Sequence, residues 1–271
     1  MKKGIDLSYS NGNIDMAKVK GSGIDFIILR LGYGKSKNQI DSRFYENYDK
    51  ALKLGIPIGV YLYSYAHNCQ DALEEAKLVI DVVKYLKLEY PIFIDMEDAD
   101  GYKSRNNIDY STCIDICETF CEYIESFGYY VGIYANLDWL NNKINSDKLD
   151  RFDKWVAQWS NTCDYKKEYG LWQYSCKGIV SGIQGNVDLN YALKDYPAII
   201  YNNNLNYLNN SNSSNNFNLK YLYNVQAGDT LSKIARKFNT NWEKIYNLNK
   251  ETIGNNPNYI KVGQKLIIKE D

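Results

Sequence analysis

The chain has 271 residues, 45% of them hydrophobic and 14% aromatic, which is enough for one large domain and a small second one. Its 32 lysines and arginines nearly balance 33 aspartates and glutamates. We expect no nucleic-acid partner, because a generic nucleic-acid binder is strongly basic. No segment approaches the ~20 consecutive apolar residues of a membrane span, so we also expect no membrane insertion.

The first predicted strand covers residues 4–8, where Asp6 faces away from the two apolar side chains of the segment. Lys2 and Lys3 directly precede this strand and leave no room for the apolar part of a secretory signal. We therefore expect synthesis in the cytoplasm without a signal peptide.

Strand-like apolar runs and helical patterns alternate over most of the chain. The predicted helices cover 41–54, 69–88 and 110–127, and the strand-like runs cover 26–34, 57–66, 129–136, 155–159 and 171–175. In the third helix Cys113, Cys117 and Cys121 recur every four residues. This spacing indicates small buried side chains on one helix face, in preference to disulfides or metal ligands.

Residues 91–98 carry the strongest chemical signal. In this predicted strand Asp95 and Glu97 share one face, with Cα atoms roughly 6.5–7 Å apart, and apolar residues fill the other face. Two carboxylates on one face repel each other and are costly to bury unless the protein uses or pairs them. Residues 186–190 repeat the design of the first strand, with Asp188 as their acid.

Together these segments make about eight strands, the number that a closed parallel barrel requires. The first and last strands of a barrel are neighbours, so Asp6 and Asp188 should be adjacent, with Asp95 and Glu97 across the lumen. We expect a distorted α/β barrel of the (β/α) TIM-like type, with eight strands, fewer outer helices and a hydrolytic acid cluster at the strand ends. Each acid taken alone has another interpretation, as a cap or a salt-bridge partner of a residue such as Arg30.

Aromatic side chains accompany the acids near the predicted mouth. Sugar rings stack on aromatic faces and tyrosine or glutamine can bind their hydroxyl groups, although core packing is an alternative for any one ring. His67 is interpreted as a loop residue, and no His/Cys spacing or glycine-rich phosphate loop predicts a metal or a cofactor. The candidate substrate-binding residues are Tyr61, Tyr63, Tyr134, Trp159, Gln173 and Tyr174.

The composition changes after Asp195. Asn and Ser dominate residues 202–218, which contain no charged residue and predict a linker over 197–219. Residues 220–271 show a β-α-α-β pattern and hold nine Lys/Arg against five Asp/Glu, a balance that suits a module on an anionic polymer. The expected domains are therefore a barrel over 1–196, the linker and a small domain over 220–271.

Several motifs of the barrel region resemble glycoside hydrolase family 25, the lysozymes (N-acetylmuramidases) of bacterial and phage origin. The matching segments are Gly4–Ser8, Arg30–Gly34, Gly59–Tyr61, Phe93–Glu97, Trp172–Ser175 and Val187–Asn190. The resemblance implies cleavage of the β-1,4 bond between N-acetylmuramic acid and N-acetylglucosamine in peptidoglycan. It maps the family's acid pair onto Asp95 and Glu97, and its flanking acids onto Asp6 and Asp188.

The C-terminal region resembles a LysM module through the segments Tyr223–Leu231, Ile234–Ala235 and Val262–Leu266. Such modules bind glycans that contain N-acetylglucosamine, so the resemblance implies peptidoglycan glycan strands as the partner. The residues implied at the glycan groove are Gly228, Asp229, Thr230, Leu231, Asn256 and Ile260. For Asp229 and Thr230, helix N-capping is an equally good interpretation.

Three functions are compatible with these observations. The one we favour is an endolysin-like lysozyme, anchored by LysM and acting on the wall after release from the cell, with phage lysis as the expected route. A chitinase or N-acetylglucosaminidase is the alternative among enzymes, because those barrels also use acid clusters on strands. A peptidoglycan-binding protein without activity is the third, but it has no reason to retain a costly acid cluster.

Overall fold

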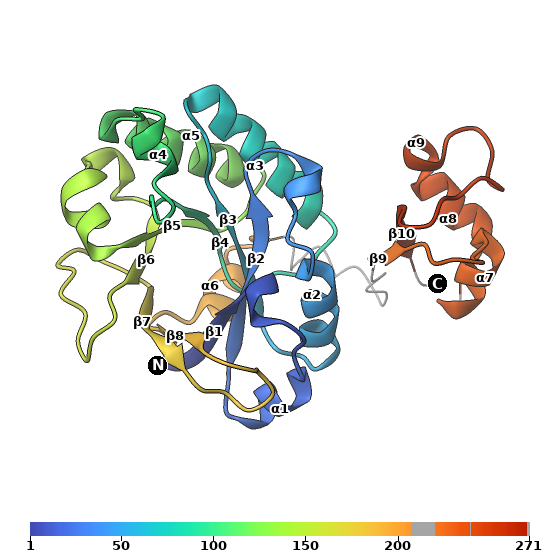
Figure 1. The fold of residues 1–271 in the computed structure, drawn as a ribbon, viewed down its shortest axis with the longest axis horizontal. Coiled ribbons are helices and arrows are strands. Elements are labelled where there is room, and N and C mark those ends of the chain that lie inside the picture. Colours follow the sequence, from blue (N-terminus) through green and yellow to red (C-terminus); the bar gives the residue numbers. More distant parts are fainter. Residues whose placement is uncertain (207–219, 239, 270–271) are drawn as a thin grey trace. The chain divides into compact units, whose positions relative to one another are not determined.

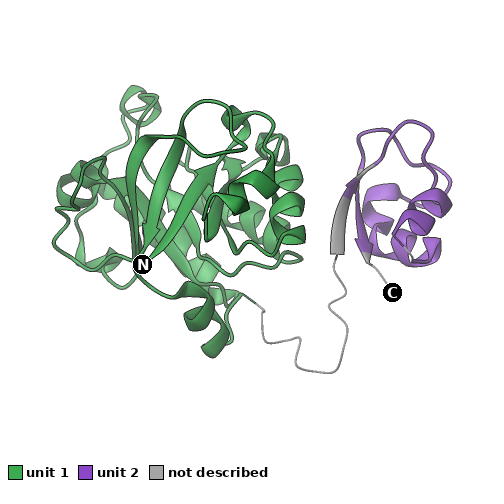
Figure 2. Cartoon of the chain, turned by 90° about the horizontal axis from the view of Figure 1, so that it is seen from below, with its two compact units in different colours: residues 1–210 green, residues 211–271 purple. Residues whose placement is uncertain are grey.

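The computed structural model describes residues 1–206, 220–238 and 240–269 (Figure 1). The chain divides into two compact units, residues 1–210 and residues 211–271 (Figure 2). No helix of the described residues is both long enough and apolar enough to cross a membrane.

The first unit is a closed eight-stranded barrel in which each strand pairs with the next and β8 pairs with β1. Its strands are β1 (Lys2–Leu7), β2 (Phe26–Tyr33), β3 (Ile58–Tyr63), β4 (Ile92–Asp95), β5 (Val131–Asn136), β6 (Asp153–Ala157), β7 (Leu171–Gly178) and β8 (Val187–Ala192). The expected eight-stranded barrel is thereby confirmed.

One strand departs from the all-parallel expectation. β1 to β7 run parallel, but β8 is antiparallel to both β7 and β1. Only the short segment 179–186 joins β7 to β8, whereas a parallel connection needs a crossover of a dozen or more residues. The reversed direction brings the beginning of β8, with Asp188, to the same barrel end as the carboxyl ends of the other strands.

Helices cover the outside of the barrel unevenly (Figure 1). The α-helices of this unit are α1 (Met16–Gly21), α2 (Phe44–Lys53), α3 (Cys69–Val83), α4 (Tyr102–Arg105), α5 (Tyr110–Ser126) and α6 (Tyr196–Asn202). Single turns complete the connections: η1 (Tyr9–Asn11), η2 (Lys37–Gln39), η3 (Trp139–Lys143) and η4 (Asp147–Leu149). Between β5 and β8 the described chain has no α-helix, so the barrel has fewer outer helices than strands, as expected.

Helix α5 shows how local sequence and packing agree. The Asp109 side chain accepts a hydrogen bond from Thr112 N at 2.7 Å and caps the helix start. Cys113, Cys117 and Cys121 are free thiols buried on the face toward the core, which confirms their packing role.

Two apolar layers hold the barrel together. Alternate residues of β4 divide between them: Phe93 belongs to the cluster inside the lumen, whereas Ile92, Ile94 and Met96 belong to the layer between strands and helices. The period-two alternation decides which side chains of a regular strand face the lumen. The polar residues that face the lumen near the strand ends line the pocket at its mouth.

The barrel unit continues beyond the expected boundary at residue 196. Asp195 caps α6, and Asn206 is buried under the barrel, where its Nδ2 donates to Leu88 O at 3.0 Å and its Oδ1 accepts from Tyr130 N at 2.8 Å. These contacts satisfy main-chain groups next to β4 and β5, so the expected linker start at residue 197 is wrong. The rest of that expectation, residues 207–219, lies outside the described residues.

The second unit is a small βααβ domain with one additional helical turn. It comprises β9 (Lys220–Asn224), α7 (Leu231–Lys237), α8 (Trp242–Leu248), α9 (Lys250–Ile253) and β10 (Lys265–Lys269). The two strands pair antiparallel, and the helices bury apolar residues such as Ile234 and Ile245 against Leu266 and Ile268. Asn249 joins the helices to the sheet, because its Oδ1 accepts from Ile267 N and its Nδ2 donates to Ile267 O, both at 2.7 Å.

Candidate active site

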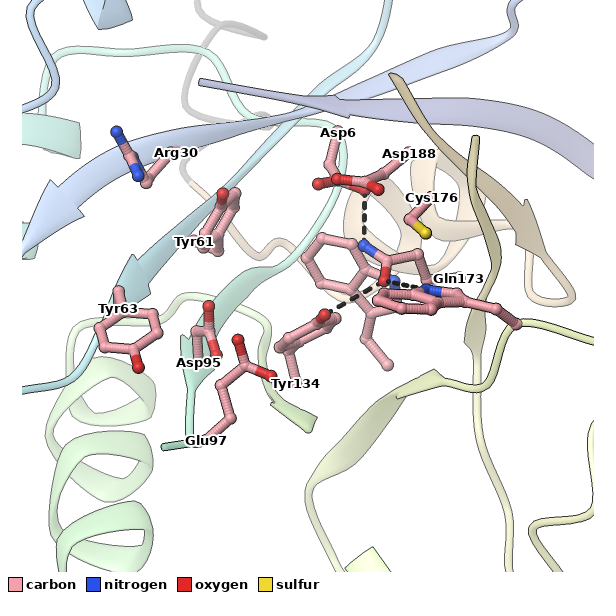
Figure 3. A pocket seen from close by; sticks show the side chains of 12 residues that line it. Asp6, Arg30, Tyr61, Tyr63, Asp95, Glu97, Tyr134, Gln173, Cys176 and Asp188 are labelled. Atoms are coloured by element: carbon pink, nitrogen blue, oxygen red, sulfur yellow. Dashed lines mark hydrogen bonds between the residues drawn. The ribbon is translucent and has the colours of Figure 1, made fainter. Parts of the chain in front are cut away.

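A pocket of about 390 Å³ lies at the barrel end where β1 and β4 finish (Figure 3). It is lined by Asp6, Arg30, Tyr61, Tyr63, Asp95, Glu97, Tyr134, Trp155, Trp159, Gln173, Cys176 and Asp188. The structure therefore brings together all four acids and five of the six substrate-binding residues that the sequence predicts for the barrel.

Asp6 and Asp188 form a carboxyl pair on one wall of the pocket. They lie directly opposite each other in the β1–β8 ladder and hydrogen-bond through their side chains. Burial, and then the charge of Asp188, raises the pKa of Asp6 to about 8. Burial also raises the pKa of Asp188. Asp6 therefore retains its proton at neutral pH, and its side chain is hydrogen-bonded to Asp188.

Asp95 and Glu97 line the pocket away from the Asp6–Asp188 pair (Figure 3). Asp95 is 4% exposed, and its Oδ1 has no hydrogen-bond partner among the described residues. Burial, and then the neighbouring Glu97, raises the pKa of Asp95. Burial likewise raises the pKa of Glu97, while Lys103 opposes this shift. A carboxyl group with a raised pKa is suited to donate a proton near neutral pH.

A hydrogen-bonded network fixes the opposite side of the pocket. Gln173 Nε2 donates to Asp6 Oδ2 at 3.0 Å, and Gln173 Oε1 accepts from Tyr134 Oη and from Trp159 Nε1, both at 3.1 Å. Asn190 Nδ2 donates to the same Asp6 oxygen at 2.8 Å. Two amide donors on one oxygen favour the ionised form of Asp6 but do not overcome its burial.

The tyrosines of β3 line the pocket wall, with Tyr61 between the two acid pairs and Tyr63 beside Asp95 (Figure 3). Tyr61 contacts the edge of Trp155, with ring centroids 5.8 Å apart, and Tyr63 Oη donates to Asp100 at 3.4 Å. Arg30 also reaches the pocket, but it pairs with Asp41 at 2.7 Å. The alternative interpretation, in which Arg30 forms a salt bridge with a lumenal acid, is therefore not what the structure shows, because Arg30 is paired with Asp41.

Tyr174 is the predicted substrate-binding residue that the structure places elsewhere. Its neighbour Gln173 faces the lumen, so Tyr174 points to the outside of the barrel. There it stacks on Tyr191 of β8, with ring centroids 4.3 Å apart and planes 14° apart. The prediction for Tyr174 is wrong because its ring packs against Tyr191 and does not line the pocket.

Four residues that line the pocket or bond to its lining residues were not predicted: Trp155, Cys176, Asn190 and Lys103. Asn190 was accessible to sequence reasoning, because it stands two residues after Asp188 and therefore shares its strand face. Trp155 Nε1 donates to Asn190 Oδ1 at 2.8 Å beneath the pocket. Cys176 lines the pocket as a free thiol. No sequence pattern pointed to Lys103.

The glycan-groove residues of the small domain have mixed surroundings. Gly228 and Asn256 are exposed, Ile260 is half-buried, and Leu231 is buried in the domain core, so Leu231 packs instead of facing a ligand. Thr230 caps α7 by accepting a hydrogen bond from Lys233 N at 3.2 Å. Asp229 accepts from Tyr223 Oη at 2.8 Å and from Gln226 N at 2.7 Å, which orders the loop before α7.

Outside the pocket, His67 follows β3, and its Nε2 shares a 2.7 Å hydrogen bond with Tyr102 Oη. Within the described ranges, no group of three or more His, Cys, Asp or Glu side chains is arranged to hold a metal ion. The pocket itself presents carboxyl groups, tyrosines, tryptophans, an arginine, a thiol and an amide.

The mouth of the barrel thus gathers four carboxyl groups among aromatic rings. The family model for Glycosyl hydrolases family 25 matches residues 5–183, and the model for the LysM domain matches residues 223–269. The chain belongs to glycosyl hydrolase family 25 and carries a C-terminal LysM domain.

Individual relatives agree with this assignment. The autolytic lysozyme of Clostridium acetobutylicum is 29% identical over 188 residues, which are 69% of this chain and 54% of that protein. Lysozyme M1 of Streptomyces globisporus is 25% identical over a match that covers 69% of this chain and 66% of that protein. The modular autolysin LytC of Streptococcus pneumoniae, solved with a synthetic peptidoglycan ligand, is 32% identical with a TM-score of 0.62 and covers 70% and 46% of the two chains. The chain thus spans about half the length of the first of these lysozymes and less than half of LytC.

Proposed function

We propose that this chain is a lysozyme that hydrolyses the β-1,4 bond between N-acetylmuramic acid and N-acetylglucosamine in peptidoglycan. The observation that carries the proposal is the pair of buried Asp95 and half-buried Glu97, both with raised pKa values, in a pocket lined by tyrosines and tryptophans. The relatives' names as lysozymes and autolysins support the same substrate.

Glu97 is the proposed general acid, which protonates the leaving glycosidic oxygen as the bond to the anomeric carbon breaks. Asp95 is on the same side of the pocket, so it is poorly placed to attack that carbon from the opposite face. Its unpartnered Oδ1 can instead accept the N–H of the substrate's 2-acetamido group. The acetamide oxygen would then attack the anomeric carbon, as in substrate-assisted glycosidases, and water would open the resulting ring with Glu97 as base.

Tyr134 and the Asp6–Asp188 pair complete this mechanism. In the structure the Tyr134 hydroxyl donates to Gln173 Oε1. We assign Tyr134 to the carbonyl oxygen of the substrate's acetamido group. Its hydroxyl must then release Gln173 and donate to the substrate. Asp6 and Asp188 set the electrostatics of the far wall and hold the incoming water. In the competing mechanism they activate that water for direct inversion.

The test is mass analysis of peptidoglycan digested by the full chain. New reducing ends on muramic acid support the proposal, whereas new reducing ends on glucosamine identify an N-acetylglucosaminidase. Absence of both, at enzyme concentrations where the chain binds the wall, identifies a binding protein. The Glu97→Gln variant is the control for a contaminating hydrolase, because it retains the shape of the site without the acidic proton.

We further propose that the LysM domain binds glycan strands and supplies affinity for the wall, not chemistry. Tethering a module next to its polymer raises the local concentration of the enzyme without a new contact at the pocket. Synthesis in the cytoplasm and release by phage lysis stay predictions from the sequence. Fractionation of producing cells, with and without a membrane-permeabilising agent, tests them: lysis should require permeabilisation.

A further inference from the structure

Lys103 is a buried lysine behind the acid pair. It lies on α4, the four-residue helix that follows β4 after a left-handed turn at Gly101 (φ 69°). The residue is 2% exposed, and its Nζ donates to two main-chain carbonyls, Ser64 O at 2.7 Å and Glu97 O at 2.8 Å.

The two carbonyls belong to neighbouring strand ends. Ser64 follows β3 and Glu97 follows β4, and these strands are in register through Tyr63 and Asp95. The ammonium therefore bridges the main chain at the point where Tyr63, Asp95 and Glu97 enter the pocket. Asp98 holds the lysine's own backbone in place, because its Oδ1 accepts from Lys103 N at 2.6 Å.

The charge of Lys103 is not used in an ion pair within the described part of the chain. Burying an ammonium group is unfavourable, and an ion pair usually offsets part of that cost. Here its positive charge instead favours the ionised forms of Asp95 and Glu97 and lowers the pKa of each, against the effect of burial. Arg30, the cation that lines the pocket itself, is already paired with Asp41.

Other charged or titratable groups also surround this ammonium. They are Tyr63 of β3, Asp95 and Glu97 at the end of β4, Asp98 in the following loop, Glu75 of α3, and Cys113 and Cys117 of α5. Glu75 is bonded to Ser64 Oγ and Tyr65 N, so it stabilises the same strand end from the other side.

We propose that Lys103 is a positioning residue for the hydrolysis: its buried ammonium clamps the ends of β3 and β4 together and holds an unpaired positive charge beside Asp95 and Glu97. The inference rests on the proposed function of that acid pair. It assigns to Lys103 no contact with the substrate, so its removal should lower kcat and leave KM nearly unchanged. The proposal also predicts that the charge of Lys103 sets the pH range in which the enzyme is active.

The experiment compares pH profiles of kcat/KM on soluble, uncross-linked peptidoglycan strands for the full chain. Lys103→Met removes the charge and the donors, whereas Lys103→Gln removes the charge and retains a donor. Without the positive charge both carboxyl pKa values rise, so both limbs of the profile should move to higher pH in both variants. Each pH unit of displacement is a tenfold loss on the acid limb.

Lys154 offers a matched control. It is also buried, 4% exposed, and its Nζ donates to two carbonyls, Leu149 O at 2.6 Å and Phe152 O at 2.5 Å, but it does not line the pocket. Lys154→Met should lower the melting temperature and leave both limbs in place.

The outcomes are distinct. If the limbs of the kcat/KM profile stay at the wild-type pH in folded Lys103→Met or Lys103→Gln, the proposal is overturned and Lys103 has a structural role only. The same conclusion follows if Lys154→Met moves the limbs by as many pH units as the Lys103 variants do. If Lys103→Met does not fold by near-UV circular dichroism, the Gln variant decides. A wild-type chain that releases no muramic acid ends would refute the proposed function itself, which separates the two failures.

Discussion

The Asp6→Asn substitution should stabilise the barrel at neutral pH. Folding raises the pKa of Asp6 from 3.8 to about 8, so the folded state retains a proton that the unfolded chain loses. The contribution of Asp6 to stability is therefore complete below pH 4 and is lost as the pH rises toward 8. The slope is about 1.4 kcal/mol per pH unit, which amounts to roughly 4 kcal/mol at pH 7.

An asparagine reproduces the neutral form of Asp6. Its oxygen can accept from Gln173 and Asn190, as Asp6 Oδ2 does, and its amide can donate to Asp188. The native contacts thus survive, while the unfolded chain no longer gains by ionisation. The free energy of unfolding of the variant should exceed that of the wild type at pH 7, and this gain should shrink toward zero near pH 4.

Urea unfolding followed by tryptophan fluorescence at several pH values measures this gain. Four of the five tryptophans are in the barrel unit, so the signal reports mainly on the barrel. A stability difference that stays constant between pH 4 and pH 7, or a variant less stable than the wild type at pH 7, would contradict the assignment of the retained proton to Asp6.

Four further predictions follow from the site. Glu97→Gln should lower kcat at least ~10²-fold in a turbidity assay, and retention of more than a tenth of the activity would remove Glu97 as the acid. Trp159→Ala should raise KM by about 3–10-fold, because Trp159 is 63% exposed on the pocket, whereas Tyr174→Ala on the outer face should leave KM unchanged. A chain of residues 1–210 should cleave soluble strands normally but sediment less with intact walls; equal sedimentation would exclude a role of LysM in affinity. Proton NMR should show the β-anomer as the first product, and an α-anomer would establish inversion.

The acid cluster could be predicted because it depends only on local alternation and barrel closure. Period two places Asp95 and Glu97 on one face, and the adjacency of first and last strands places Asp6 beside Asp188. The direction of β8 was not accessible in the same way, since an alternating pattern is identical in both directions. The structure resolves it through the short connection 179–186, which allows only antiparallel pairing.

Residues that act through tertiary contacts escaped prediction. Lys103 is on a four-residue helix without a periodic pattern, and its role depends on two carbonyls that are 6 and 39 positions away in the sequence. Asn206 was assigned to a polar linker by composition, yet its side-chain amide satisfies main-chain groups of two distant segments, at Leu88–Tyr90 and at Tyr130. Composition describes what a segment can bury on average, and a single asparagine that fits a specific site is invisible to it.

The attachment of Asn206 beneath the barrel has a consequence for how such proteins are assembled from parts. β1 runs from Lys2 toward Asp6 at the mouth, so the chain enters the barrel at the far end. It also leaves there, because Asn206 bonds to residues that directly precede β4 and β5. Entry and exit therefore share the barrel end opposite the pocket. A second domain can therefore be joined to either terminus, or exchanged for another, without rebuilding any wall of the pocket.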